Sequence, residues 1–444
     1  MLIAGSNACI ASKLPNLGNP SRRTLPAHQE QKLGKKMMLA LKLSMPLVQD
    51  PIVNDYIYHL GYQLVSHSTI PSHPFHFFVV RSSTSNAFSL PWGYIGINSG
   101  LILKMQSEGE LASVLAHEIA HNSQKHIARA FAEQKKLQLS SMGALLAAAI
   151  LGVKSPNAAA GMASAVTAGG IQHMLNFSRG HEAEADRVGM QILTAAGFDP
   201  NAMPALFNRL ASENRLNDLD VQESFRTHPV TETRLADAYN HSEQYAPFHY
   251  LKNNQEFYLI QARLVVDLTT IPSALLKNYK VLLKKSKTFN YKLRYAYALA
   301  LSKDHQYKKA KQQINKLIKK YPSQILFRMT KADIELRAGK NKAALADLKP
   351  LYNHNSDYYP LIMQYAKTLI KNKKPKTALN ILNSFDSLYN QNENLLLLLS
   401  EAQWRSGQKA AAYKTRAKVC LLNGRKKAAK EQLKMASKFA KNRN

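Results

Sequence analysis

Two histidines and a glutamate stand at a zinc-binding spacing in the segment His117-Glu118-Ile119-Ala120-His121. On a helix, residues four apart lie on one face and one turn apart, so both imidazoles can bind a single zinc ion. Glu118 would then lie beside the metal, where it can take a proton from an activated water and pass it to a leaving amine. The spacing therefore predicts a hydrolase with one zinc ion per chain.

A catalytic zinc site needs a third protein ligand, and the candidate lies in residues 178–186, Ser-Arg-Gly-His-Glu-Ala-Glu-Ala-Asp. This segment begins a predicted helix that ends near Gly197. Glu182 and Asp186 share one face of it, so Glu182 can bind the metal while Asp186 accepts the second ring N–H of a ligand histidine. Glu184 points elsewhere and is expected to be a solvated carboxylate.

The elements around the first motif are those that a buried helix needs. Apolar residues follow helical spacing over about 34–66, alternate as in a strand over 75–79, and suggest a hairpin over 86–97. Ser107 and Glu110 form a capping box at the start of the helix that carries the histidines. This context argues against a surface helix that merely carries two histidines.

Four pieces of the chain match one known pattern: Asn86-Ala87-Phe88, His117-Glu118-Ile119-Ala120-His121, Ser178-Arg179 with Glu182 and Asp186, and Thr227-His228-Pro229 with Arg234. They resemble the gluzincin-type zinc peptidases that include HtpX and the CAAX prenyl proteases, and within them a BepA-like periplasmic branch. The resemblance implies that His117, His121 and Glu182 bind zinc and that Glu118 is the general base. It also implies that the strand at Asn86, Ala87 and Phe88 binds substrate by strand addition.

Two residues of the last piece stay open to two interpretations each. By the resemblance, His228 can occupy the fourth metal position and hold the enzyme latent, whereas alone it would be a routine loop histidine before a proline. Arg234 either steadies the oxyanion of the reaction or pairs with an acidic side chain.

Beyond residue 250 the chain repeats every 34 residues. Small residues mark the register at two positions of each unit: Ala310, Ala344, Ala378 and Ala412, and twelve residues earlier Ala298, Ala332, Ala366 and Ser400. This is the tetratricopeptide pattern, in which small residues let paired antiparallel helices approach and stack into a superhelix. The step shortens to 17 at Ala429, which predicts an irregular half unit at the end.

The charge of the chain lies almost wholly in the repeats. Residues 251–444 hold 40 basic and 11 acidic residues, a net charge of +29, and the whole chain has a net charge of +31. Such a surface would attract acidic proteins or the anionic head groups of a membrane, although a generally basic proteome would give the same excess with no partner. Without a groove-reading motif, no nucleic acid partner is expected.

Three segments carry weaker signals. The first residues lack the basic start of a secretory signal and are either a truncated leader or a disordered start, and Ser6 argues against Cys9 as a lipid attachment site. The longest apolar run, 142–153, is too short to span a membrane. Residues 140–171, rich in Ala, Gly and Met, are either a hairpin over the cleft that faces a membrane or partner, or two packed small-residue helices.

The predicted fold is therefore mainly α: a gluzincin-type α+β metallopeptidase domain over 34–245 and a tetratricopeptide α-solenoid over 253–444, after a disordered segment 1–33. By resemblance, we expect a periplasmic zinc endopeptidase that cleaves unfolded or stalled proteins in outer-membrane protein assembly and quality control. Its partners would be outer-membrane proteins and their assembly machinery, bound by the repeats. The alternatives are a chaperone or adaptor with a latent protease, and a structural protein whose zinc is not hydrolytic.

Overall fold

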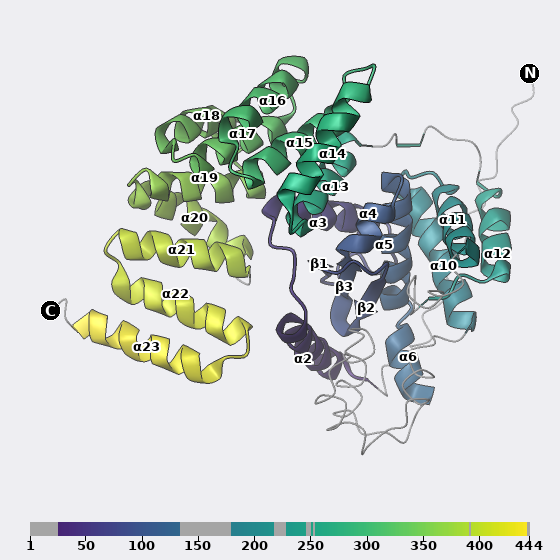
Figure 1. Cartoon of the computed structure of the whole chain (residues 1–444). Coiled ribbons are helices and arrows are strands. Elements are labelled where there is room, and N and C mark those ends of the chain that lie inside the picture. Colours follow the sequence, from purple (N-terminus) through teal and green to yellow (C-terminus); the bar gives the residue numbers. More distant parts are fainter. Residues whose placement is uncertain are drawn as a thin grey trace, which may run out of the picture.

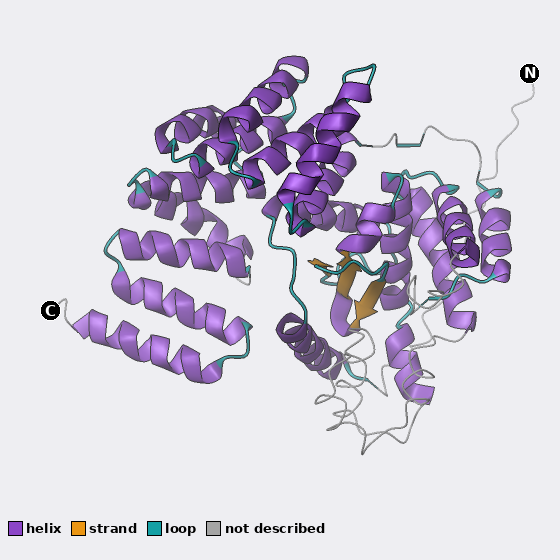
Figure 2. Cartoon of the chain, viewed as in Figure 1, coloured by secondary structure: helices purple, strands orange, loops and turns teal. Residues whose placement is uncertain are grey.

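The computed structural model describes residues 25–133, 179–216, 228–245, 250–251, 254–389 and 392–441. Figure 1 shows a helical unit with a small sheet, formed by the first half of the chain, and an array of stacked helices formed by the second. Figure 2 shows how few strands accompany the helices. The predicted fold class is confirmed. The predictions for the leader, for Cys9 and for residues 140–171 lie outside the described residues.

Two helices, α2 (Ala27–Ser44) and α3 (Pro51–Val65), occupy the stretch for which helical spacing was predicted. Pro46 breaks the run, because a proline disfavours helical backbone in the residue before it, and Met45 is extended at φ −131° and ψ 135°. The helical spacing predicted over 34–66 is therefore divided between two helices at this point.

The start of α2 also corrects the predicted disorder of residues 1–33. The helix begins at Ala27, directly after Pro26, and the side chain of Leu33 is buried in a cluster with residues of the sheet. Glu30, in its first turn, accepts a hydrogen bond from Trp92 N at 3.3 Å and pairs with Lys125 at 3.2 Å. Residues 27–33 are thus part of the folded unit.

A three-stranded sheet supports one side of the unit. Its order is β1 (His76–Val80), β3 (Tyr94–Asn98), β2 (Ala87–Leu90), and the predicted hairpin is the antiparallel pair of β2 and β3. The turn between them, η1 (Pro91–Gly93), takes left-handed backbone at Gly93, whose N–H donates to Asn122 Oδ1 at 3.0 Å. This bond ties the turn to the end of the histidine helix.

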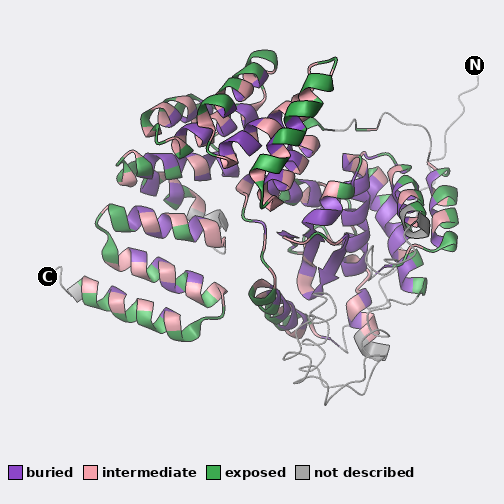
Figure 3. Cartoon of the chain, in the orientation of Figure 1, coloured by how far each residue is buried: buried purple, intermediate pink, exposed green. Residues whose placement is uncertain are grey.

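The histidine helix, α5 (Glu108–Ser123), is buried along almost its whole length (Figure 3). Ser107 caps it by accepting from Glu110 N at 3.1 Å, as predicted. The reciprocal half of the capping box differs, because the Glu110 carboxylate accepts from Gln106 N at 2.7 Å and pairs with Arg209. The short helices α4 (Ser99–Lys104) and α6 (His126–Glu133) flank it.

Helix α10 (Arg179–Ala195) packs along α5, and α11 (Ala202–Leu216) and α12 (Glu232–Ser242) cover their outer side. Gly189 allows the close approach, because a Cβ at this position would lie 3.1 Å from the backbone N and Cα of His117. The glycine therefore sets how near the carboxylates of α10 come to the histidines of α5.

The second half of the chain is a solenoid of antiparallel helix pairs. Its helices are α13 (Gln255–Leu268), α14 (Pro272–Lys285), α15 (Tyr291–Lys303), α16 (Tyr307–Lys320), α17 (Ile325–Arg337), α18 (Asn341–His354), α19 (Tyr359–Lys371), α20 (Pro375–Tyr389), α21 (Glu393–Arg405), α22 (Lys409–Leu422) and α23 (Lys426–Lys441). From α15 to α22 each pair begins 34 residues after the one before. Ala310, Ala344, Ala378 and Ala412 are fully buried, and α23 is the predicted half unit.

The solenoid and the first unit share one continuous hydrophobic core. Helix α13 packs on α3 and α4, and α19 packs on α3. Arg263 of α13 pairs with Asp50, the N-cap of α3, at 2.7 Å, and Lys42 of α2 lies 3.6 Å from Glu393 of α21. The described helices include none long and apolar enough to cross a membrane.

An acidic cluster lies where α13 meets α3 and α5. Burial, followed by the charges of Asp55 and Glu108, raises the pKa of Glu256 from 4.5 to about 7. Burial likewise raises the pKa of Asp55 to about 6. The folded chain therefore binds more protons here than the unfolded chain, and stability is lost as the pH rises from about 4.5 through 7.

We accordingly expect Glu256→Gln to stabilise the protein at pH 8 by roughly 1–3 kcal/mol and to have a smaller effect at pH 5. The measurement is the urea midpoint of wild type and variant at both pH values. Glu401→Gln, on the exposed side of α21, is the matched control. An equal difference at pH 5 and pH 8 would show that Glu256 is not protonated by folding.

Candidate metal centre

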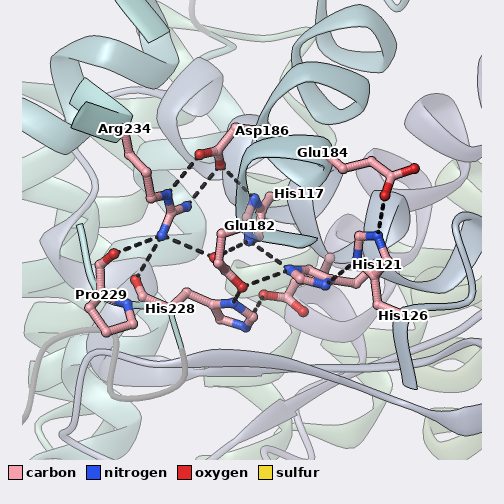
Figure 4. A network of polar contacts seen from close by, with 10 residues as sticks. His117, His121, His126, Glu182, Glu184, Asp186, His228, Pro229 and Arg234 are labelled. Atoms are coloured by element: carbon pink, nitrogen blue, oxygen red, sulfur yellow. Dashed lines mark hydrogen bonds and ion pairs between the residues drawn. The ribbon is translucent and has the colours of Figure 1, made fainter. Parts of the chain in front are cut away.

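Four buried side chains converge between α5, α10 and the segment before α12. The possible ligand atoms of His117, His121, Glu182 and His228 all lie within 4.8 Å of one another, and each residue is at most 6% exposed. Among the described residues they form the one such group. Figure 4 shows their side chains pointing toward one another.

Within this group the two helices supply three donors. The Nε2 atoms of His117 and His121, one turn apart on α5, are 3.0 Å from each other. Glu182 faces both from α10, with Oε2 3.5 Å from His117 Nε2 and Oε1 3.4 Å from His121 Nε2. The sequence spacing and the close approach at Gly189 together produce this arrangement.

His228 adds the fourth donor from a segment without regular structure. Its Nδ1 lies 2.7 Å from Glu182 Oε1, and its Nε2 lies 3.5 Å from Glu118 Oε1. Its backbone carbonyl accepts a hydrogen bond from Arg234 Nη1 at 3.2 Å. The histidine thus contacts both the candidate ligand and the candidate base. Its neighbour Thr227 lies outside the described residues.

Asp186 and Arg234 make polar contacts with two members of this group, His117 and Glu182. Asp186 Oδ1 is 2.9 Å from His117 Nδ1, on the side of the ring away from Glu182. Arg234 binds the same carboxylate through Nε at 2.7 Å and Nη2 at 2.8 Å, and its Nη1 reaches Glu182 Oε2 at 3.0 Å. Of the two roles left open for Arg234, this geometry is that of an acid-paired arginine.

The charges of the site favour a bound cation. Burial raises the pKa of Glu182, but the nearby His228 and His117 outweigh it, so the pKa lies well below the usual 4.5 and the carboxylate is ionised. Burial lowers the pKa of His117, yet Asp186 and Glu182 reverse this and raise it to about 10. Two carboxylates therefore draw positive charge to the ring.

The residues present fit a metal ion. Ligands at the usual distances from a tetrahedral zinc are about 3.3 Å apart, close to the separations among His117, His121 and Glu182. Two imidazoles, a carboxylate and a fourth position form a donor set that suits zinc. Metal would also supply the positive charge that the two carboxylates attract.

Glu118 lies beside the ligands and is fully buried. Burial raises the pKa of its carboxyl group, and the electrostatic effect of the nearby His228 and His117 counteracts the rise. A carboxylate whose pKa is moved toward neutrality is a better proton acceptor and donor near pH 7.

The predicted substrate strand lies next to this helix. Asn86 precedes β2, and Ala87 and Phe88 are its first residues; β2 is an edge of the sheet and packs on α5. Asn86 O accepts from Asn98 N at 2.9 Å, which places the inner edge of the segment on β3. β2 is thus an edge strand of the described sheet, the position at which strand addition takes place.

Sequence reasoning missed two residues of the network. Glu184 is paired rather than solvated: its Oε2 lies 2.7 Å from Arg129 Nη1 and 3.2 Å from His126 Nε2. His126 in turn contacts His121, with 2.8 Å between their Nδ1 atoms. A spacing of five residues gave no signal, because positions five apart on one helix do not share a face.

The sequence model of peptidase family M48 matches residues 51–241. A putative beta-barrel assembly-enhancing protease of Vibrio cholerae is 32% identical over 412 residues, covering 92% of this chain and 85% of the relative. The beta-barrel assembly-enhancing protease of Escherichia coli K12 is 31% identical over 444 residues, covering 99% and 90%. The mitochondrial metalloendopeptidase OMA1 of Schizosaccharomyces pombe is 33% identical over 165 residues, covering 35% and 43%.

Proposed function

We propose that this chain, which belongs to peptidase family M48 and is a metalloendopeptidase, binds one zinc ion through His117, His121 and Glu182. The observation that carries the proposal is the convergence of these buried donors with His228 within 4.8 Å. When bound, zinc would polarise the scissile carbonyl and lower the pKa of water.

The residues of the chain then divide the remaining work. Glu118 takes a proton from the attacking water and delivers it to the leaving amine, which its buried position beside the ligands allows. Asp186 accepts a hydrogen bond from the Nδ1–H of His117, which would leave the Nε2 lone pair directed at the metal. Arg234 holds Asp186 in place.

The substrate would bind as an added strand along Asn86, Ala87 and Phe88. This edge lies against α5, so an extended polypeptide paired with it passes beside Glu118. Backbone hydrogen bonds do not depend on side chains, which suits an enzyme for unfolded or stalled proteins of varied sequence.

The setting we propose is the periplasm, and the clients are outer-membrane proteins and their assembly machinery. The names of the bacterial relatives refer to β-barrel assembly, and transmembrane β-barrels are the proteins of bacterial outer membranes. The basic solenoid would recruit them as a stacked-helix binding surface.

One contact favours a second function, that of a chaperone or adaptor with a latent protease. His228 lies 2.7 Å from Glu182 and 3.5 Å from Glu118, so it occupies space that substrate needs. In this state the solenoid would bind clients while the site stays closed.

The test of the zinc site is the metal content of the purified full-length chain. We expect about one zinc per wild-type chain, and in Glu182→Gln a loss of affinity larger than the roughly 10–100-fold that removing an outer partner of a ligand costs. Glu401→Gln, an exposed pair partner on α21, is the control. Equal zinc content in Glu182→Gln would exclude Glu182 as a ligand, and zinc-free wild type would exclude the site.

A further inference from the structure

A second path of polar contacts leaves the metal centre through His121, on the side opposite Asp186 (Figure 4). His121 Nδ1 lies 2.8 Å from His126 Nδ1. His126 Nε2 lies 3.2 Å from Glu184 Oε2, which accepts a hydrogen bond from Arg129 Nη1 at 2.7 Å. The path therefore ends in an ion pair near the surface.

The protons of this path can run in one consistent direction. A neutral imidazole carries one N–H, and each nitrogen of His126 has a polar partner, His121 at 2.8 Å and Glu184 at 3.2 Å. If His121 Nε2 faces the metal, its Nδ1–H donates to His126 Nδ1. His126 then has its proton on Nε2 and donates it to the Glu184 carboxylate.

The backbone brings His126 to this place by a strained turn. Lys125, between α5 and α6, has φ of 57°, a left-handed conformation that costs energy in a residue with a side chain. After this turn His126 is fully buried and contacts His121, five positions before it. Strain of this kind persists where the surrounding structure imposes it.

We propose that His126 is a positioning residue for His121, held by Glu184 and Arg129. The inference rests on the proposed function, since His121 is there a zinc ligand. In this proposal each of the two histidine ligands on α5 has a supporting pair. Asp186, held by Arg234, orients the ring of His117. His126, held by Glu184, orients the ring of His121. A ring fixed in tautomer and direction binds metal more tightly.

A second metal site does not explain the same residues. His126 stacks on His181 at 4.6 Å between ring centroids and 22° between planes, which is a packing contact. The donor atoms of these two rings and Glu184 do not form a metal-binding group within the part of the chain that the structure describes.

The experiment compares two variants of the full-length chain. His126→Phe keeps an aromatic ring against His181 but removes the acceptor for His121, whereas His126→Asn keeps an acceptor near the Nδ1 position. We measure zinc affinity by competition with a chelator, the visible spectrum of the Co²⁺-loaded protein, and the unfolding midpoint of the metal-free protein. His59→Phe, an exposed histidine of α3, is the control.

We expect His126→Phe to lose roughly 10–100-fold in zinc affinity and to alter the Co²⁺ spectrum, and His126→Asn to recover most of both. The unfolding midpoints of the metal-free proteins should be the same for the wild type and both variants. If His126→Phe keeps the zinc affinity and the Co²⁺ spectrum of the wild type, the inference about His126 is overturned and the proposed function is not. A lowered metal-free midpoint in both variants, with no recovery by asparagine, would assign His126 a structural role instead. A wild-type chain that binds no zinc would overturn the proposed function itself.

Discussion

Glu118→Gln is expected to lower peptide-bond hydrolysis by about 10²–10⁴-fold while zinc content stays at the wild-type level. The reason is the position of Glu118, which is fully buried beside His117 and 3.5 Å from His228 but is outside the group of converging donors. Glutamine keeps the volume of the side chain and removes its ability to take a proton.

The measurement is the rate of cleavage of an unfolded protein such as casein, with zinc content determined on the same samples. Glu401→Gln controls for the loss of one carboxylate elsewhere in the chain, and a chelator control shows that cleavage depends on metal. Cleavage by Glu118→Gln at the wild-type rate would exclude Glu118 as the base.

The same variant separates the two proposed functions. If the protein acts as an enzyme, Glu118→Gln should fail to restore outer-membrane protein assembly in cells that lack the gene. If it acts as an adaptor through the solenoid, the inactive variant should restore assembly, because α13–α23 are unchanged.

His228→Ala is expected to raise the rate of cleavage by about 10–150-fold. Its imidazole lies 2.7 Å from the ionised Glu182, and a hydrogen bond to a charged group contributes roughly 1.5–3 kcal/mol, which is the barrier that its removal would relieve. The alanine variant leaves His117, His121 and Glu182 to bind the metal and opens the fourth position to water and substrate.

This second prediction is checked with the same cleavage assay on wild type, His228→Ala and the double variant with Glu118→Gln. The double variant should be inactive, which shows that the added activity comes from this site. His59→Ala, exposed on α3, is the matched control. An unchanged or lower rate, with zinc retained, would mean that His228 does not hold the enzyme latent.

Much of this fold could be predicted because its signals are local. The cap at Ser107 and the one-turn spacing of His117 and His121 follow from helix geometry within a few residues, and the 34-residue register of buried alanines repeats in neighbouring units. The same holds for the hairpin of β2 and β3, which a short turn connects. Such features need no knowledge of distant parts of the chain.

Other features required contacts between distant segments. The parallel pairing of β1 with β3 joins strands that no short turn connects, and the break at Pro46 is stabilised by the pairing of Leu47 with Val80. The surroundings of Glu184 were misjudged because its partners, Arg129 and His126, come from more than fifty residues away. The periodicity of the sequence indicates which face of a helix is polar, but it does not indicate which residues from other elements contact that face.

The sequence by itself determined the chemistry of this protein: the donor types, their spacing on α5 and α10, and a repeat array suited to binding. Only the tertiary structure decided how the donors meet. The absence of a Cβ at Gly189 lets α10 approach α5, the Asp186–Arg234 pair aligns one histidine, and the turn at Lys125 brings His126 against the other. Metal geometry depends on distances of a few ångströms across separate helices, and packing alone determines those distances.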